Sequence, residues 1–197
     1  MNFGKQSSIK IPIVMANLSM YNFLTLNGFY KGDNGDISWH RHGGDEAQFS
    51  KDSLQADNIL LFGRVTYDLM SSYWPTPLAE GNLPEVIEGM NNTEKIVFSK
   101  TMKNAEWKNT RVVNGNLIEE VKKLKKGSKD ITILGSGSIA TQLADAGLID
   151  AYLVMIDPVA IGSGTPIFNG LQHTLNLKLI DSRVFNSGVV LLTYKPE

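Results

Sequence analysis

The sequence predicts a three-layer α/β/α protein whose central sheet is mostly parallel and ends in an antiparallel C-terminal hairpin. Two observations support this fold class. Residues 131–134, 138–146 and 151–156 read as strand, helix and strand, and so short a crossover joins parallel strands. Residues 177–185 and 188–194 are extended segments joined by Asn186-Ser187, which is typical of a hairpin.

The remaining elements are predicted from apolar spacing in chain order. Residues 20–26 are bulky and extended, so they form a buried strand, and Asn27-Gly28 supplies the turn after it. Residues 46–56 have helical spacing, with Ala47, Phe49, Leu54 and Ala56 facing inward, and the apolar run 59–62 is a central strand. Residues 65–71 resume as a short helix.

The second half of the chain follows the same pattern. Pro75, Pro77, Gly81 and Pro84 predict a surface loop, because each breaks regular structure. Residues 95–99 and 111–113 are predicted strands, and 116–126 form an amphipathic helix that ends at Gly127.

Length and composition favour one domain. The 197 residues include 42% hydrophobic and 20% charged residues, which is ordinary globular usage. We predict an N-terminal extension over residues 1–17, in which 9–14 form a short strand interrupted by Pro12, and a single domain over 18–197.

Charge and cysteine content limit the partners. Nineteen basic and twenty acidic residues give a formal charge of −1, which offers no strong attraction to nucleic acid or to a membrane surface. The absence of cysteine excludes disulfides and thiol chemistry. No signal-peptide core or apolar run of membrane-spanning length is present, so we expect a cytoplasmic protein with a small-molecule partner.

Three strand ends carry residues suited to a dinucleotide. Gly135-Ser136-Gly137 lies between a strand and a helix, where backbone N–H groups can bind pyrophosphate and Ser138 can cap the helix. Gly63-Arg64-Val65-Thr66 is a second such junction with a guanidinium and a hydroxyl. Ser99-Lys100-Thr101 offers the chemistry of a ribose 2′-phosphate site, which favours NADP(H) over NAD.

Two other interpretations of the glycine junction remain open. It can be a tight strand-to-helix turn without a ligand. Gly135 to Ala140 also fits the G-x-G-x-x-A fingerprint of a Rossmann dehydrogenase, with Asp157 as the ribose-binding acid. Against the second interpretation, several elements precede this junction, whereas the fingerprint belongs to the first β-α-β unit.

These motifs resemble a known superfamily. The segment 62–67, Phe-Gly-Arg-Val-Thr-Tyr, is similar to the G-R-x-T-[YW] segment of dihydrofolate reductases, and 96–100 and 134–139 resemble their V-x-S-[RK] and G-G-x-x-[IL] segments. Residues 25–29 and 162–168 resemble motifs of the reductase domain of bacterial riboflavin biosynthesis and its stand-alone relatives. The resemblance covers about residues 20–194 and implies a dihydrofolate reductase-like fold.

The resemblance also implies roles. Arg64, Ser99 and Lys100 would hold the 2′-phosphate region, and Thr25 to Gly28 would lie beside the nicotinamide. Thr66 and the run Gly135, Ser136, Gly137, Ser138 and Ile139 would bind the pyrophosphate. Tyr67 and Trp74, by helical spacing after Arg64, and Gly162 and Phe168, in the late loop, are candidates for substrate binding. The riboflavin-pathway relatives are typically dimers, so the resemblance implies a homodimer.

The catalytic candidates are Asn27 and Trp39. Asn27 stands where the family has an acid, and an amide hydrogen-bonds a substrate but does not relay a proton as a carboxyl group does. Trp39 can stack on a planar heterocycle, beside His40 and His42. Asp33, Asp36, Asp45 and Glu46 are interpreted as turn and cap residues, His173 as structural, and no metal site is predicted.

The sequence therefore favours an NADPH-dependent reductase that transfers hydride to a small heterocycle of the pterin or pyrimidine/ribosylamino type. By resemblance it would act like dihydrofolate reductase or 5-amino-6-(5-phosphoribosylamino)uracil reductase. One alternative is an NADP(H)-binding protein of the same fold with little or no turnover, which Asn27 motivates. The other is a Rossmann-type NAD-dependent dehydrogenase built on Asp157.

Overall fold

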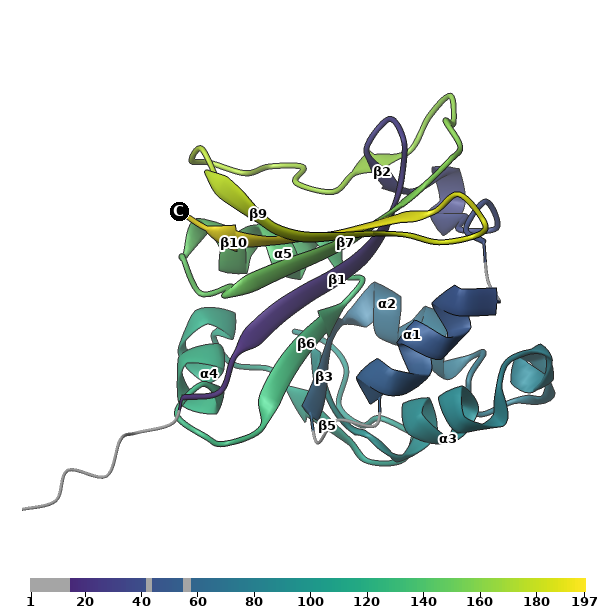
Figure 1. Ribbon diagram of the computed structural model, residues 1–197. Coiled ribbons are helices and arrows are strands. Elements are labelled where there is room, and N and C mark those ends of the chain that lie inside the picture. The colour runs from purple at the N-terminus through teal and green to yellow at the C-terminus, as the bar shows by residue number, and fades with distance from the viewer. Residues whose placement is uncertain (1–14, 42–43, 55–57) are drawn as a thin grey trace, which may run out of the picture.

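An eight-stranded sheet in the order β5-β4-β3-β6-β1-β7-β10-β9 forms the centre of the molecule (Figure 1). The computed structural model describes residues 15–41, 44–54 and 58–197. The predicted strand over 9–14, His42 and Ala56 lie outside these residues. Within the described ranges, no helix is long and apolar enough to cross a membrane.

The strands and helices alternate along most of the chain. The strands are β1 (Leu18–Thr25), β2 (Phe29–Lys31), β3 (Asn58–Gly63), β4 (Glu94–Phe98), β5 (Thr110–Val113), β6 (Asp130–Leu134), β7 (Ala151–Asp157), β8 (Thr165–Pro166), β9 (Leu177–Val184) and β10 (Val190–Pro196). The α-helices are α1 (Gly44–Leu54), α2 (Arg64–Ser71), α3 (Pro84–Asn92), α4 (Leu117–Leu124) and α5 (Gly137–Asp145), with 3-10 turns η1 (Asp33–Gly35) and η2 (Pro77–Gly81).

The pairing of the strands confirms the predicted fold class. β1 is parallel to both β6 and β7, and β3 is parallel to both β6 and β4. Only the C-terminal hairpin reverses direction in this sheet: β10 is antiparallel to β7 and to β9. β2 and β8 form a separate two-stranded sheet beyond the carboxyl end of β1.

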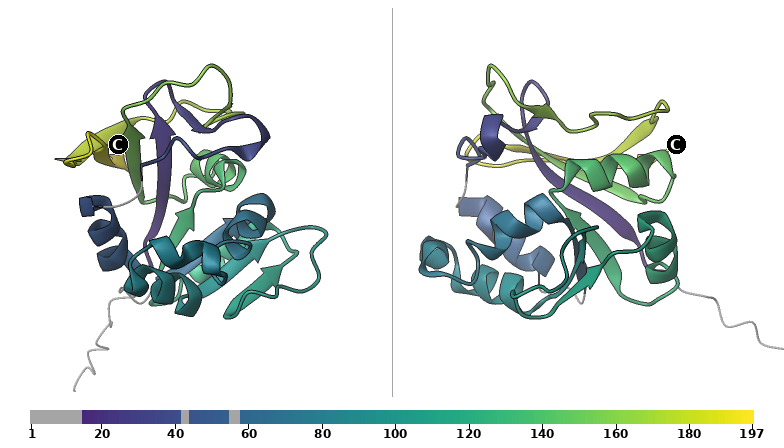
Figure 2. Two further views of the ribbon diagram at one scale, coloured as in Figure 1. Left: turned by 90° about the vertical axis from the view of Figure 1, so that its right-hand side faces the viewer. Right: turned by 180° about the vertical axis from the view of Figure 1, so that it is seen from behind.

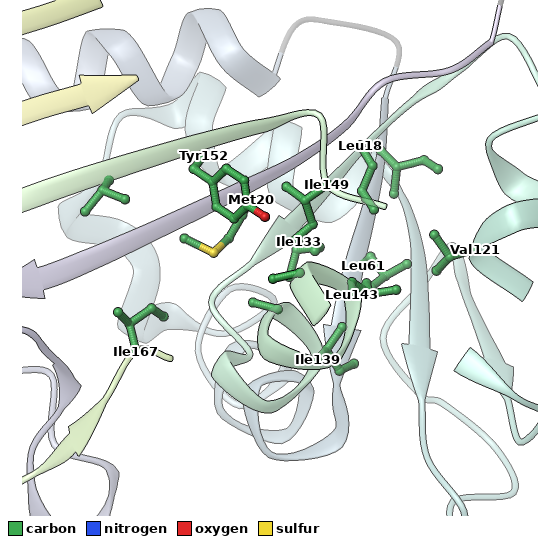
Figure 3. Close-up of a cluster of buried hydrophobic side chains, with 14 of the residues drawn as sticks. Leu18, Met20, Leu61, Val121, Ile133, Ile139, Leu143, Ile149, Tyr152 and Ile167 are labelled. Atoms are coloured by element: carbon green, nitrogen blue, oxygen red, sulfur yellow. The ribbon is translucent and has the colours of Figure 1, made fainter. Parts of the chain in front are cut away.

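Apolar side chains on both faces of the sheet hold the layers together. On one face, Leu18 and Met20 of β1 and Ile133 of β6 pack against Ile139 and Leu143 of α5 (Figure 3). On the other face, Leu60 and Phe62 of β3 pack with Tyr67, Val86, Met90 and Trp107. Helix α1 lies in front of the sheet in Figure 1, and α5 lies behind it, as the view from behind in Figure 2 shows, so helices cover both faces of the sheet.

Two predictions of local structure were wrong. The proline-rich stretch contains η2 and α3 instead of being a loop throughout, because Pro77 and Pro84 occupy first-turn positions, where the missing N–H costs nothing. Glu46 is not a simple helix cap: it is the buried residue of α1, and it accepts a hydrogen bond from Ser187 in the C-terminal hairpin.

Lys95 is a fully buried lysine that anchors α3 to the sheet. Its ammonium donates to the carbonyls of Met90, Asn91 and Thr93 at 2.9, 3.1 and 2.7 Å, and lies 4.5 Å from the ring centroid of Trp107. The cation therefore satisfies carbonyl groups at the end of α3. Burial lowers the pKa of Lys95 from 10.5 to about 8.

This shift predicts a stability difference that depends on pH. Because the unfolded chain holds the Lys95 proton up to a higher pH than the folded chain, the free energy of unfolding rises with pH between the two pKa values. Between pH 7 and pH 10, the free energy of unfolding of the unmodified protein should therefore rise by roughly 2 kcal/mol relative to that of Lys95→Met. Denaturant unfolding of both proteins across this range measures it. A difference that stays constant with pH would contradict the assignment.

Candidate functional site

A cleft of about 780 Å³ runs along the carboxyl edge of the sheet. Residues after β4, β3 and β6 line it, and these three strands are neighbours in the sheet. Parallel pairing brings their carboxyl ends to the same edge, so the three predicted junctions meet in one place. The end of β5 and residues of β1 and β2 complete the lining.

The two glycine junctions are tied by one hydrogen bond. The Gly63 N–H, before α2, donates to the Ser136 hydroxyl, before α5, at 2.8 Å. Ser136 has a left-handed backbone (φ 59°, ψ 58°) and is the N-cap residue of α5, so the helix begins one residue earlier than the sequence suggests. Ser138 is therefore not the cap: it lies exposed in the first turn and lines the cleft.

Close approach explains the glycines of this junction. Gly135 has φ 65°, and a Cβ there would lie 3.1 Å from Thr66 Cγ2. A Cβ on Gly137 would lie 2.8 Å from two ring carbons of Tyr30, which reaches over the junction from β2. Both glycines thus allow α2, α5 and β2 to converge on the same part of the cleft.

A second region of the cleft is built at the ends of β4 and β5. The Ser99 hydroxyl accepts from the N–H groups of Thr101 and Met102 at 3.3 and 3.0 Å, which fixes the turn after β4. The Asn114 amide donates to the carbonyls of Ser99 and Met102 at 2.6 and 2.9 Å and joins this turn to the end of β5. Asn114 also lines the cleft, and the sequence analysis did not identify it.

Arg64 connects the two regions. Its guanidinium donates to the Thr101 hydroxyl at 3.1 Å and pairs with Asp68 at 3.3 Å, and the side chain remains more than half exposed. Lys100 is exposed and lines the same region. The two cations that the sequence assigned to a 2′-phosphate therefore flank the turn after β4.

The charge of the cleft is one-sided. Its lining contains three cationic side chains, Arg64, Lys100 and Lys31, and not a single aspartate or glutamate among the residues that the structure describes. The whole protein carries a formal charge of −1. A local excess of positive charge in a concave site favours an anionic ligand.

Part of the cleft lining is apolar. Tyr21 and Phe23 of β1, Ile37 after η1, and Leu69 and Met70 of α2 are among its residues. Aromatic and aliphatic walls of this kind suit a planar organic ring. In the sequence, Tyr21 and Phe23 alternate with the apolar residues that are buried in β1, which predicts that both lie on the same face of the sheet. The alternation does not show that this strand lines a cleft.

Buried polar side chains lie behind Tyr21 and Phe23. The His40 ring stacks on Phe23 with centroids 3.5 Å apart, and its Nδ1 lies 2.8 Å from a carboxylate oxygen of Asp157. The other Asp157 oxygen accepts from the Arg41 N–H at 2.9 Å. Burial raises the pKa of Tyr21, a hydrogen bond with Ser50 opposes this, and the charges of Asp157 and Glu46 raise it further.

These contacts bear on the dehydrogenase alternative. Asp157 is fully buried, and its two oxygens bind His40 and the Arg41 backbone. A ribose-binding acid has to be exposed at the cofactor, so Asp157 does not fit that role. His40 is buried as well, and it is not among the described residues that line the cleft.

The predicted residues at the end of β1 do not line the cleft. The Thr25 hydroxyl donates to Asn27 Oδ1 at 2.9 Å and accepts from the Phe29 N–H at 3.0 Å. The Asn27 amide donates to the Ile161 carbonyl at 2.8 Å, and Asn27 Oδ1 accepts from the Ile161 N–H at 3.3 Å. Asn27 thereby joins the turn after β1 to the segment after β7.

The other candidates are spread over the fold. Tyr67 is buried, and its hydroxyl accepts from the Trp107 N–H at 3.1 Å. Trp74 packs in the same core and donates to the Met70 sulfur at 3.2 Å. Phe168 packs against Tyr152, Gly162 is exposed, and Trp39 donates to the Asp36 carbonyl at 3.2 Å. None of the five is among the residues that line the cleft in the described ranges.

A family model and a curated relative each match most of the chain. The model of the family described as the RibD C-terminal domain matches residues 16–191. The uncharacterized protein YyaP of Bacillus subtilis (strain 168) is 35% identical over 173 residues, which cover 87% of this chain and 90% of YyaP.

Solved structures share the fold at low identity. Dihydrofolate reductase from Enterococcus faecalis, complexed with NADP(H) and RAB-propyl, has a TM-score of 0.62 and 18% identity, covering 92% of this chain and 96% of that one. The diaminohydroxyphosphoribosylaminopyrimidine deaminase/5-amino-6-(5-phosphoribosylamino)uracil reductase of Thermotoga maritima has a TM-score of 0.65 and 14% identity, covering 93% and 57%.

The contacts of Asn27 predict the effect of restoring an acid there. In Asn27→Asp, a carboxylate would face the Ile161 carbonyl in place of a donor, so the variant should lose about 1 kcal/mol of stability and gain no reductase activity. Thermal unfolding at pH 7 and NADPH oxidation with dihydrofolate measure both effects. Below the carboxyl pKa the protonated side chain can donate again, so the loss of stability should shrink. A gain in turnover would contradict this account.

Proposed function

Because the chain belongs to the RibD C-terminal domain family, we propose that it is an NADPH-dependent reductase that acts on a small heterocycle of the pterin or pyrimidine/ribosylamino type. The observation that carries the proposal is the cleft, in which three cations and no described carboxylate surround the junctions before α2 and α5. NADPH carries negative charge at its pyrophosphate and its 2′-phosphate, and a cleft of about 780 Å³ is large enough for an extended ligand.

The residues present fit the 2′-phosphate. Arg64 and Lys100 present a guanidinium and an ammonium beside the turn after β4, and the Thr101 hydroxyl already lies 3.1 Å from the guanidinium. A guanidinium binds phosphate oxygens through more than one N–H, which suits a dianionic group at an exposed site. The Asn114 bonds hold this turn in place when the phosphate binds.

The residues at α5 fit the pyrophosphate. The first N–H groups of a helix have no partner within the helix, and those of α5 open into the cleft at Gly137 and Ser138. The Ser136 hydroxyl accepts from the Gly63 N–H, which aligns α2 with α5 and leaves its own O–H to donate to a phosphate oxygen. The missing side chains of Gly135 and Gly137 make room for Thr66 and for the Tyr30 ring, which brings α2 and β2 close to the start of α5.

We place the reaction at the apolar side chains of the cleft lining. When bound, NADPH supplies a hydride. Tyr21, Phe23, Leu69 and Met70 would position the acceptor ring and exclude water from it. The substrate also needs a proton. We do not place its supply at Asn27, whose amide is bonded to Ile161 and which is not among the described residues that line the cleft.

A second candidate is an NADP(H)-binding protein with little or no turnover. The observation that favours it is the lining of the cleft, which holds neither a carboxylate nor a histidine in the described part of the chain. Saturable NADPH binding, without NADPH oxidation across a panel of pterins, pyrimidines and quinones, would support this candidate over the reductase.

Cofactor binding can be tested with the purified protein. NADPH should raise the melting temperature more than NADH does, because only NADPH carries the 2′-phosphate. Arg64→Met should reduce the shift with NADPH and leave the shift with NADH nearly unchanged. Differential scanning fluorimetry with millimolar nucleotide measures both, and Lys126→Met, an exposed lysine after α4 that does not line the cleft, is the matched control. The absence of any shift with NADPH would refute the proposal.

We also propose that the protein is a homodimer. β9 is the edge strand of the sheet, and Leu179, Ile180 and Val184 expose 50%, 51% and 73% of their surface. An apolar edge strand is a template for pairing with a second copy through a two-fold axis.

Light scattering after size exclusion tests the homodimer. The unmodified protein should elute with twice the mass of the chain, and Ile180→Lys with Val184→Lys should shift it toward the monomer, because the charges oppose association of two edges. Leu78→Lys with Leu26→Lys, at exposed positions outside β9 and outside the cleft lining, serves as the control. A monomer at all concentrations would contradict the proposal.

A further inference from the structure

We propose that Lys31, on β2, is the cation that binds the pyrophosphate of the dinucleotide, separately from the pair Arg64 and Lys100 at the 2′-phosphate. This inference rests on the proposed binding of NADPH. It assigns a role to a lysine that sequence analysis did not single out, and that comes from a different part of the chain than the three strand-to-helix junctions.

The position of Lys31 supports the assignment. Lys31 lines the cleft, and its ammonium lies 5.5 Å from the ring centroid of Tyr30. The Tyr30 ring in turn lies against Gly137, where a Cβ would come within 2.8 Å of it. Lys31 is thus the cation on the α5 side of the cleft, whereas Arg64 reaches across to Thr101 after β4.

The charge around Lys31 supports it as well. Among the described residues, no carboxylate lies within ion-pair distance of the Lys31 ammonium. The neighbouring Asp33 is directed to the Ser163 hydroxyl. A half-buried ammonium that faces a cleft without carboxylates gains most from an anion inside the cleft.

The backbone around Lys31 is fixed by the second sheet. β2 pairs with β8, with Lys31 opposite Thr165, and the Lys31 carbonyl packs so closely on Gly164 that a Cβ there would lie 2.4 Å away. The Asn27 bonds to Ile161 and the Asp33 bond to Ser163 tie the same two segments together. The ammonium is therefore presented from a constrained segment, which lowers the entropy cost of holding an anion.

The two cation groups make different predictions for three ligands. NADPH carries the pyrophosphate and the 2′-phosphate, NADH carries only the pyrophosphate, and adenosine 2′-monophosphate carries only the 2′-phosphate. Lys31→Met should weaken the binding of NADPH and of NADH by the same factor, about tenfold, and leave the affinity for adenosine 2′-monophosphate unchanged. Arg64→Met should weaken NADPH and adenosine 2′-monophosphate and leave NADH unchanged.

Titration calorimetry of the full-length protein measures these affinities. Lys31→Arg keeps the charge and should retain most of the affinity, and Lys126→Met should behave as the unmodified protein. Melting temperatures without ligand show whether Lys31→Met is folded. If it is not, Lys31→Gln replaces it and is measured at two salt concentrations. The NADPH affinity of this variant should depend less on salt than that of the unmodified protein.

The outcomes separate this inference from the proposed function. If Lys31→Met binds NADPH as the unmodified protein does while Arg64→Met does not, Lys31 has no cofactor role and the reductase proposal stands. If Lys31→Met changes only the KM of a heterocyclic substrate, the lysine serves the substrate and the inference is overturned. If the unmodified protein binds no NADPH, both fail together.

Discussion

The hydrogen bond from the Gly63 N–H to the Ser136 hydroxyl is the contact on which the site depends. It joins the starts of α2 and α5, which follow the neighbouring parallel strands β3 and β6. Ser136 can accept this bond because its left-handed backbone turns the chain into α5 at once, and Gly135 tolerates the contact with Thr66. Without this hydrogen bond, α2 and α5 would still begin at the same edge of the sheet, but nothing would fix the position of one N-terminus relative to the other.

The rest of the cleft is arranged around that junction. On the β4 side, Arg64 and Lys100 offer positive charge next to a turn that Asn114 holds. On the β1 side, the ring of Tyr30 covers Gly137 and places Lys31 at the cleft. Both sides are cationic while the protein as a whole is slightly acidic, so the field is local to the site. The lining also contains apolar side chains such as Tyr21 and Phe23, and this combination of cations and apolar walls suits a ligand with an anionic body and a neutral reactive ring.

Buried polar residues next to Phe23 hold this part of β1 in place. His40 stacks on Phe23 and binds Asp157, and Glu46 at the start of α1 binds Ser187 of the C-terminal hairpin. These bonds connect the end of β7, the hairpin and α1 to the strand that lines the cleft. Groups so buried and bonded are fixed in place, and the charges of Asp157 and Glu46 raise the pKa of the Tyr21 hydroxyl.

The sequence by itself determined the order of strands and helices, the parallel sheet with its antiparallel hairpin, and the three strand ends that line the cleft, because each depends on local spacing and on glycine chemistry. Only the tertiary structure decided which other residues join them. Asn27 and Ile161, Tyr30 and Gly137, and His40 and Asp157 are far apart along the chain, and no local pattern shows that they meet. For that reason the sequence identified the junctions of the proposed cofactor site at Gly63, Ser99 and Gly135, but could not show that Asn27 bonds to a neighbouring loop, that Tyr67 belongs to the core, or that Lys31 faces the cleft.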